Sequence, residues 1–200
     1  MSVSTTTADG VDRVDPRIAR SREAILAAAV ELVAEVGVGA VTVEAIGKRS
    51  GVAKTTIYRH WPSLDHLVMD ALTAIAAPCV VPDTGTLRGD LLEIALGLAR
   101  SLGSSPLAKV IPSLVDAAER SPELATLQRG WVKERRSSVR KAIEAAQERG
   151  EVGPDLDVEL LTALQSGPLF YRRLVSHEPL SPAFVESVVD AVMAVAEATS

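Results

Sequence analysis

The chain of 200 residues contains a single cysteine, Cys79, and only three histidines. One thiol excludes an intrachain disulfide and leaves no cysteine pair to hold zinc. His60, His66 and His177 lack the i, i+4 spacing with which two helical histidines share a metal, so no metal or cofactor is expected. We expect Cys79, beside Pro78, to be a buried, inert thiol in a reducing cytosol.

Catalytic signatures are also missing, since the sequence has no phosphate-binding loop, no His-Glu-x-x-His motif and no Gly-x-Ser-x-Gly elbow. No apolar run approaches the roughly 20 residues needed to cross a bilayer, and residues 1–10 are polar, unlike a secretory signal. We therefore expect a soluble, cytoplasmic protein that is not an enzyme and has no membrane partner. Residues 1–15, rich in Ser, Thr and Asp, predict a disordered leader.

Aromatic residues make up 3% of the chain, whereas apolar residues as a whole make up 47%. The core must therefore consist mainly of Ala, Leu and Val. Between Ile18 and Val36 apolar residues recur at spacings of three, four and seven, which is typical of a helix with one buried face. No alternating strand pattern competes anywhere, so the sequence predicts an all-α fold of about nine helices.

The most informative stretch that is present is Gly51–Ser63, GVAKTTIYRHWPS. Gly51 can take the positive φ of a sharp turn after a short predicted helix over 43–50. In the next helix Val52 and Ile57 can face a core, which leaves polar, cationic and aromatic side chains on the other faces. Each of these alone is more often a solvated surface group, but together they favour a helix-turn-helix whose second helix enters the major groove of DNA.

These residues resemble the N-terminal DNA-binding domain of the TetR family of transcriptional regulators. The resemblance runs from about Arg17 to Leu72 and rests on Ile25-Leu26-Ala27-Ala28-Ala29, on Gly37 followed by Thr42-Val43, and on a Gly-Val-x-Lys-x-x-Ile-Tyr-x-His-aromatic helix from Gly51. It implies a three-helix helix-turn-helix within a DNA-binding domain over residues 16–76, and a helical ligand-binding and dimerisation domain over 86–200.

The resemblance and the chemistry of the side chains imply a set of DNA contacts. A guanidinium such as that of Arg59 can fork onto guanine, whereas phosphate contacts position the protein without reading sequence. The family often has a phosphate-binding lysine where this chain has Leu64, and Arg59 and Lys48 are the cations able to compensate. We predict contacts to phosphates from Thr42, Lys54, Tyr58 and His60, and contacts to base edges from Thr55, Thr56 and Arg59.

The net charge of −5 is unevenly distributed along the chain. Residues 17–64 carry seven Lys or Arg against four Glu, a balance of +3, whereas residues 1–16 sum to −2 and the remainder to −6. A mildly basic head on an acidic body suits a DNA-binding protein with a separate sensing domain.

Capping residues predict where several helices begin and end. Gly37 should close the first helix, and Thr42 and Ser63 should cap the starts of later ones. Ser-Pro pairs at 105–106, 121–122 and 181–182 predict three further starts. The longest helical pattern runs over 122–149, and its charged middle, from Lys133 to Lys141, is predicted to be a solvated face.

Two wide apolar stripes near the C-terminus exceed what a small domain needs for its own core. We expect them to meet a symmetry mate in a four-helix bundle, as the resemblance also implies. Aromatic side chains of this domain either line the inducer pocket that the family keeps there or, as is commoner on helices, fill the core. The predicted dimer residues are Leu161, Leu164, Val185, Val188, Val189 and Val192, and the candidate pocket residues are Trp131, Phe170 and Tyr171.

Together these features favour a ligand-responsive repressor. It would bind a near-palindromic operator in double-stranded DNA as a homodimer and release it when an unidentified small-molecule inducer fills the second domain. A TetR-like activator would show the same sequence features. The rival outside this class is a helical ligand-binding or scaffold protein without specific DNA binding, which would lack the steep loss of DNA affinity with rising salt.

Overall fold

The computed structural model of the protein describes residues 16–198. These residues form ten α-helices and one 3-10 turn and contain no strand, which confirms the predicted all-α class. The leader predicted over residues 1–15 lies outside the described residues. None of the described helices is both long enough and apolar enough to cross a bilayer.

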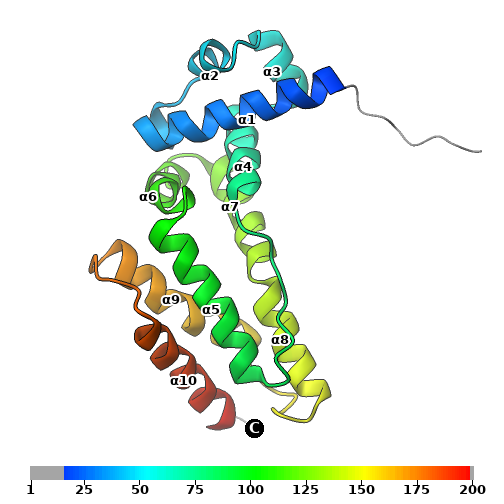
Figure 1. Ribbon diagram of the computed structural model, residues 1–200, viewed down its shortest axis with the longest axis vertical. Helices are drawn as coiled ribbons and strands as arrows, with labels where there is room; N and C mark the ends of the chain where they lie inside the picture. Colours follow the sequence, from blue (N-terminus) through cyan, green and yellow to red (C-terminus); the bar gives the residue numbers. More distant parts are fainter. Residues whose placement is uncertain (1–15, 199–200) are drawn as a thin grey trace, which may run out of the picture.

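Four helices form a head at one end of the elongated molecule (Figure 1). The long helix α1 (Pro16–Val36) packs against α2 (Val43–Ser50) and α4 (Leu64–Ile75), and α3 (Lys54–His60) packs on α2. The turn η1 (Val38–Ala40) joins α1 to α2. Aliphatic side chains fill the space between these helices, as the composition predicts, and they include Ile25, Ala29, Ile46, Ile57, Leu67 and Leu72.

The predicted caps of the head are confirmed. Gly37 follows α1 with φ 79°, and Gly51 ends α2 with φ 70°. The hydroxyl oxygen of Thr42 accepts from the backbone N–H of Ala45 at 3.1 Å, and that of Ser63 accepts from His66 at 3.3 Å. These side chains satisfy N–H groups that the first turn of a helix leaves without a backbone partner.

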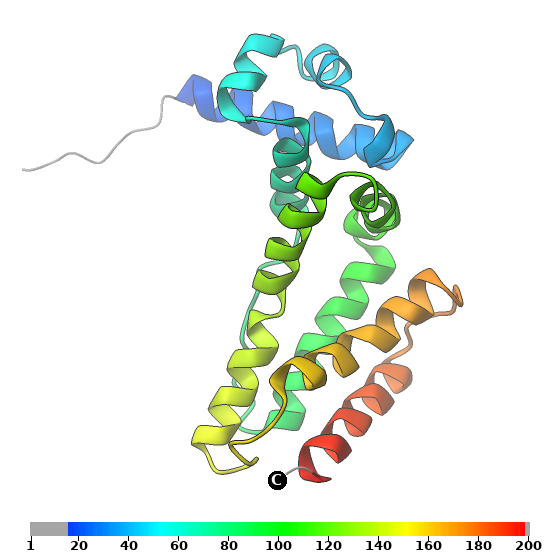
Figure 2. The same cartoon turned by 180° about the vertical axis from the view of Figure 1, so that it is seen from behind.

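Six further helices build the body of the molecule. Helix α5 packs against α6, α8, α9 and α10, and α4 continues from the head onto α7. Seen from behind, α9 crosses α5 on its way from the foot of α8 to the start of α10 (Figure 2). In chain order the helices are α5 (Leu87–Ser104), α6 (Leu107–Ala118), α7 (Pro122–Arg135), α8 (Ser137–Glu148), α9 (Val158–Leu174) and α10 (Pro182–Ala198).

Two predicted helix boundaries in the body are wrong. The pattern over 122–149 is two helices, because the backbone at Arg136 (φ −80°, ψ −8°) tightens and its N–H is shared between the carbonyls of Val132 and Glu134. Ser105 does not cap α6; its hydroxyl donates to the carbonyl of Ser101 at 2.6 Å, because α5 continues to Ser104. The split at Arg136 explains why ten helices form where about nine were expected.

An extended connection, residues 76–86, runs from α4 along α7 and α8 to the start of α5 (Figure 1). Cys79 lies in it and is exposed, so the expected buried thiol is wrong. The reason is that this segment lies on the outside of the helices, where its side chains gain no cover.

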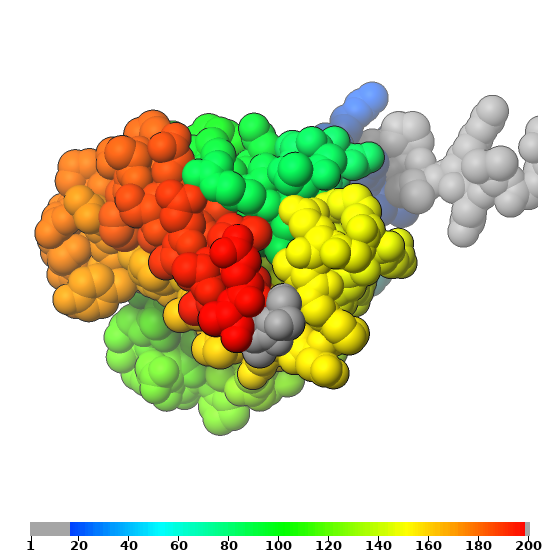
Figure 3. Space-filling view, turned by 90° about the horizontal axis from the view of Figure 1, so that it is seen from below, coloured from blue at the N-terminus to red at the C-terminus, as the bar shows by residue number. Residues whose placement is uncertain are grey.

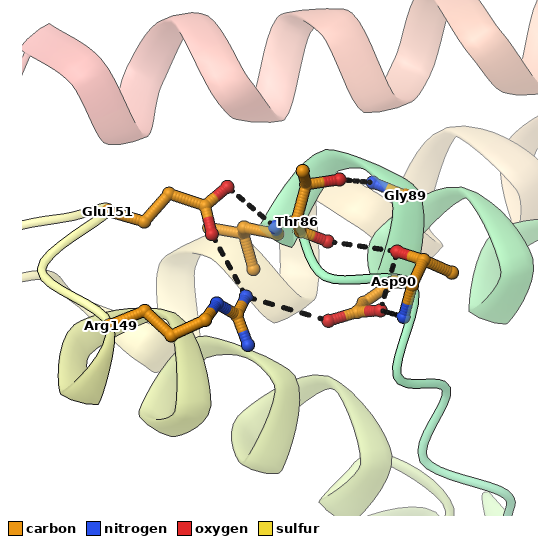
Figure 4. A network of polar contacts seen from close by, with 7 residues as sticks. Thr86, Gly89, Asp90, Arg149 and Glu151 are labelled. Carbon is orange, nitrogen blue, oxygen red and sulfur yellow. Dashed lines mark hydrogen bonds and ion pairs between the residues drawn. The ribbon is translucent and has the colours of Figure 1, made fainter.

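A buried carboxylate fastens the far end of this connection (Figure 4). Asp90, only 1% exposed, accepts from the backbone N–H and the hydroxyl of Thr84, both at 2.8 Å. Arg149 lies 3.8 Å from the same carboxylate and 2.9 Å from Glu151, which in turn accepts from the N–H of Leu87 at 2.7 Å. The network joins the connection, the first turn of α5 and the loop after α8.

Candidate nucleic-acid interface

Two buried side chains fix the orientation of α3. Ile57 is 1% exposed and Trp61, directly after the helix, is 3% exposed. The indole N–H of Trp61 donates to Asp70 on α4 at 2.9 Å, and Arg22 on α1 binds the same carboxylate at 2.7 Å. With one face of a two-turn helix held this way, the remaining faces must point away from the core.

The close approach of α2 and α3 depends on a glycine. A Cβ atom added to Gly47 would lie 3.0 Å from the carbonyl oxygen of Val52 and 3.8 Å from Ile57. Any larger residue would therefore push the turn and the start of α3 away from α2. The GK pair at 47–48 gives no local signal of this contact, so the sequence alone does not predict the role of Gly47.

The outward side chains of α3 are largely the predicted DNA contacts. Lys54, Thr55 and Arg59 are exposed, Tyr58 is 57% exposed, and Thr56 is half-buried. Within residues 16–198, the side chains of Tyr58 and Arg59 have no hydrogen-bond or ion-pair partner. An exposed ring and an unpaired guanidinium, adjacent in sequence, leave both groups available to a phosphate or a base edge.

Lys54 and Thr42 are exposed but already make contacts within the head. Lys54 forms an ion pair with Glu44 on α2, so a phosphate would have to compete with that carboxylate. The oxygen of Thr42 is used in capping, but its O–H remains able to donate to a phosphate.

His60 is placed differently from its predicted role. The residue is half-buried, its Nε2 atom is buried without a partner in the described chain, and its ring lies 5.5 Å from that of Trp61. Packing against Trp61 turns this nitrogen inward, so a phosphate contact through Nε2 is not available in this conformation.

The two neighbouring cations of α2 differ in what they can do. Arg49 is held by two carboxylates of α1, at 2.8 Å from Glu35 and 3.3 Å from Glu31, which lowers the pKa of Glu35 below its ordinary range. Lys48 is exposed, and its side chain has no partner among the described residues. Leu64 is half-buried against the core and has no group that binds phosphate. Because Arg49 is held by its two carboxylates, Lys48 is the α2 cation able to replace the phosphate contact that the family often makes at the position of Leu64.

Most of the predicted dimer residues are buried inside a single chain. Helix α10 packs against α5 and α9, next to which it lies in the view from below (Figure 3), and its valine stripe is buried between them. A side chain that is already covered cannot be buried again by a partner, so the prediction is wrong for these positions. They are Leu161, Val185, Val188, Val189 and Val192, each at most 7% exposed.

Leu164 is the exception, at 36% exposed, and it belongs to a different stripe. Leu160, Tyr171 and Val175 are 47%, 62% and 62% exposed. Their spacing along α9 puts them with Leu164 on one helix face. The sequence pattern groups Leu164 with Leu161, whereas the structure places Leu161 in the core and Leu164 on the exposed face of α9.

The candidate pocket residues do not converge on one cavity. Trp131 is half-buried on α7, with the guanidinium of Arg135 5.7 Å from its ring centre and its own buried Nε1 atom unpartnered within residues 16–198. Phe170 packs against the core, whereas Tyr171 lines a cleft of about 640 Å³ with Arg172 and Phe184. In the described part of the chain, no group of three His, Cys, Asp or Glu residues is arranged to hold a metal ion.

Two family models match the chain. Residues 25–71 match the model described as bacterial regulatory proteins, tetR family, and residues 81–192 match the tetracyclin repressor-like C-terminal domain.

Individual proteins are similar over nearly the whole chain. The uncharacterised HTH-type transcriptional regulator YdeS of Bacillus subtilis is 34% identical, covering 92% of this chain and 94% of YdeS. The DNA-binding transcriptional repressor TetR of Mycobacteroides abscessus is 30% identical over 86% of this chain and 91% of its own. The crystal structure of the TetR family transcription regulator SCO0332 superposes with a TM-score of 0.71 at 31% identity, over 88% of this chain and 98% of that one.

Proposed function

Because this chain belongs to the tetR family and is a DNA-binding transcriptional regulator, we propose that it represses transcription by binding a near-palindromic operator as a homodimer. In this proposal residues 16–76 bind DNA and residues 86–198 bind a small molecule and a second copy of the chain. The name of the Mycobacteroides abscessus relative supports repression. The residues proposed to contact DNA lie on α3, and those proposed to form the dimer lie on α9.

The observation that carries the proposal is the outward face of α3. Ile57 and Trp61 anchor the helix, and next to them the side chains of Tyr58 and Arg59 are exposed and have no partner among the described residues, 16–198. In this proposal Tyr58 binds a phosphate, Arg59 reads a base pair, and Thr55 and Thr56 contact base edges. Lys54 and Thr42 bind phosphates, with Lys54 leaving Glu44 to do so.

Dimerisation is proposed through the exposed face of α9. Leu160, Leu164, Tyr171 and Val175 form an apolar stripe on the surface of one chain, which is the kind of face that a second copy covers in a symmetric bundle. Two copies joined there would present two α3 helices to two half-sites of the operator. A small molecule releases DNA only if it binds more tightly to a dimer whose half-site spacing does not match the operator.

The test begins by selecting bound duplexes from a random DNA pool, followed by gel shifts on the selected operator. Tyr58→Ala should weaken binding to all sequences alike with little change in its salt dependence, because the phenol carries no charge, whereas Arg59→Ala should relax preference at one base pair by about 1–3 kcal/mol. Lys141→Ala, an exposed cation on α8, is the matched control and should change neither.

Full operator binding by the triple variant Lys54→Ala, Thr56→Ala, Tyr58→Ala would contradict the assignment of α3 as the reading helix. A reporter gene downstream of the selected operator then separates repression from activation. Expression should rise when the regulator is deleted.

A further inference from the structure

A second cleft, of about 480 Å³, opens where the end of α7, the start of α8 and the first turns of α9 meet. Its charged lining consists of four cations, Arg129, Lys133, Arg136 and Arg140, and one carboxylate, Glu159. A local balance of +3 is unexpected in a chain whose net charge is −5. Like charges gathered in a concave surface repel one another and raise the local concentration of anions.

Within residues 16–198, three of these four cations have no counter-charge, and two of the three have no polar partner for their side chains at all. Arg140 forms an ion pair with Glu159 across the cleft, and Arg129 donates to the hydroxyl of Thr126 at 2.8 Å. The side chains of Lys133 and Arg136 have no hydrogen-bond or ion-pair partner anywhere in residues 16–198. Lys133 is exposed but Arg136 is half-buried, so its charge is partly withdrawn from water without a counter-charge.

The spacing of the four cations along α7 and α8 brings them to one face. Positions 129, 133, 136 and 140 follow one another at spacings of four, three and four, which keeps them on one face across the junction of α7 and α8. That face lies opposite Glu159 and the buried Thr162 of α9. The face that the sequence predicts to be solvated is still exposed at Lys133 and Arg140, and it also forms one wall of a cleft.

We propose that this cleft binds an organic anion, a compound with a carboxylate or phosphate group on an apolar body. Guanidinium groups bind both kinds of head group in a two-pronged manner, and the ammonium of Lys133 adds a third donor. Val132 contributes an apolar wall, and the cleft volume falls in the range of sites for small molecules. The junction of α7 and α8 and the start of α9, whose residues line the cleft, lie below the head that carries α3 in Figure 1, away from the proposed DNA contacts.

The inference rests on the proposed function and names the chemistry of the small molecule that releases DNA. An anion in the cleft competes with Glu159 for Arg140, and this ion pair links α8 to α9. Because α9 carries the exposed stripe proposed for the dimer, loss of the link changes how α9 is held. An anion thus favours the arrangement without the ion pair, which is the differential binding that release requires.

The experiment uses the full chain and the fluorescent anion 8-anilino-1-naphthalenesulfonate, with the uncharged N-phenyl-1-naphthylamine as its matched probe. The double variant Lys133→Gln, Arg136→Gln should raise the dissociation constant of the anionic probe at least tenfold. The control Lys109→Gln, Lys141→Gln has the same net charge but alters exposed lysines outside the cleft, and it should change the constant less than twofold. Affinity for the uncharged probe should be the same in all three proteins.

Displacement identifies the head group. Decanoate, decyl phosphate and decanol share one chain length, and the two anions should displace the probe from the unaltered protein while decanol should not. Whichever anion displaces at the lower concentration indicates a carboxylate or a phosphate ligand. Glu159→Gln removes the internal competitor and should lower the dissociation constant of the anionic probe.

The inference is overturned if the cleft variant and the control lose affinity equally, or if the anionic probe does not bind. It is also overturned if duplex DNA displaces the probe, since the cleft would then be a nucleic-acid contact. Gel shifts on the same preparations separate the two proposals. If the unaltered protein binds the operator but not the anionic probe, only this inference is wrong. If the unaltered protein does not bind the operator, the proposed function itself is contradicted.

Discussion

The hydroxyl of Ser63 donates to Glu123 at 2.9 Å, so the residue that caps α4 also binds the first turn of α7. The relationship is reciprocal, because Ser121, which caps α7, donates to Asp65 in the first turn of α4 at 2.7 Å. Each serine thus joins the head to the body while capping its own helix. Movement of α7 relative to the body should therefore be transmitted to α4.

Removing either serine hydroxyl should weaken this junction. We expect Ser63→Ala and Ser121→Ala each to reduce the free energy of unfolding by about 1 kcal/mol, the usual cost of a lost N-cap. The double variant should lose less than the sum, because both residues belong to one junction. Urea unfolding measures this. Ser187→Ala is the control, since that exposed hydroxyl bonds only to its own helix, and equal losses in all three single variants would contradict the prediction.

Gly47→Ala should impair DNA binding more than folding. The added Cβ would meet the carbonyl of Val52 at 3.0 Å, which displaces the start of α3. We expect operator affinity to fall by about tenfold, or 1.4 kcal/mol, by gel shift. Gly130→Ala on α7, where nothing lies within 4 Å, should leave affinity unchanged and slightly stabilise the protein. Unchanged operator affinity in the Gly47 variant would show that the turn can absorb the methyl group.

The Glu35–Arg49 pair should contribute to stability at neutral pH and lose that contribution in acid. The hydrogen bond from Arg49 lowers the pKa of Glu35 in the folded protein. The unfolded chain therefore takes up a proton first, so the contribution is complete above the ordinary glutamate pKa and disappears as pH falls through the lowered value. In urea unfolding, the free energy of unfolding of Glu35→Gln should be lower than that of the unaltered protein at pH 7, and the two values should converge in acid. High salt should make the difference at pH 7 smaller. Glu144→Gln, at an exposed position on α8, is the control, and its free energy of unfolding should match that of the unaltered protein at both pH values.

Asp90→Ala should be the most destabilising polar substitution in the body. It leaves the Thr84 N–H without its partner and the Thr84 hydroxyl with only its longer bond to the carbonyl of Thr86, at 3.2 Å, and it removes the buried carboxylate near Arg149. We expect a loss of at least about 2 kcal/mol in thermal or urea unfolding. Asp155→Ala, exposed in the loop before α9, is the comparison and should be near neutral. A small effect at position 90 would mean that water replaces the lost carboxylate.

The dimer prediction contrasts two stripes. Leu160→Glu with Leu164→Glu should give a folded monomer by light scattering, because both side chains are on the surface of one chain. Val188→Glu should instead unfold the protein, because it places a charge in the core. A dimer that survives the two leucine substitutions would place the interface elsewhere.

Local chemistry made much of the head predictable. Glycine is nearly alone in tolerating a positive φ, and a hydroxyl placed before a helix satisfies a free N–H, so Gly37, Thr42, Gly51 and Ser63 identified their turns without reference to the fold. The outward face of α3 followed in the same way from the few apolar positions of a short helix.

Position in the sequence could not reveal which apolar face is covered within the chain and which is left exposed. The valines of α10 and the leucines of α9 have the same period, and only the packing of α10 against α5 and α9 assigns the valines to the core. Similarly, the sequence predicts a solvated cationic face, and only the packing of α9, with Glu159, opposite that face makes it one wall of a cleft.

The sequence alone therefore determined the all-α class, the turn of the helix-turn-helix and the side chains of its second helix, because these depend on residues within a few positions of one another. The tertiary structure decided the inward turn of His60, the exposed stripe of α9 and the cationic cleft. Those depend on contacts between residues far apart in the chain, where burial and charge are set by whichever helix lies opposite.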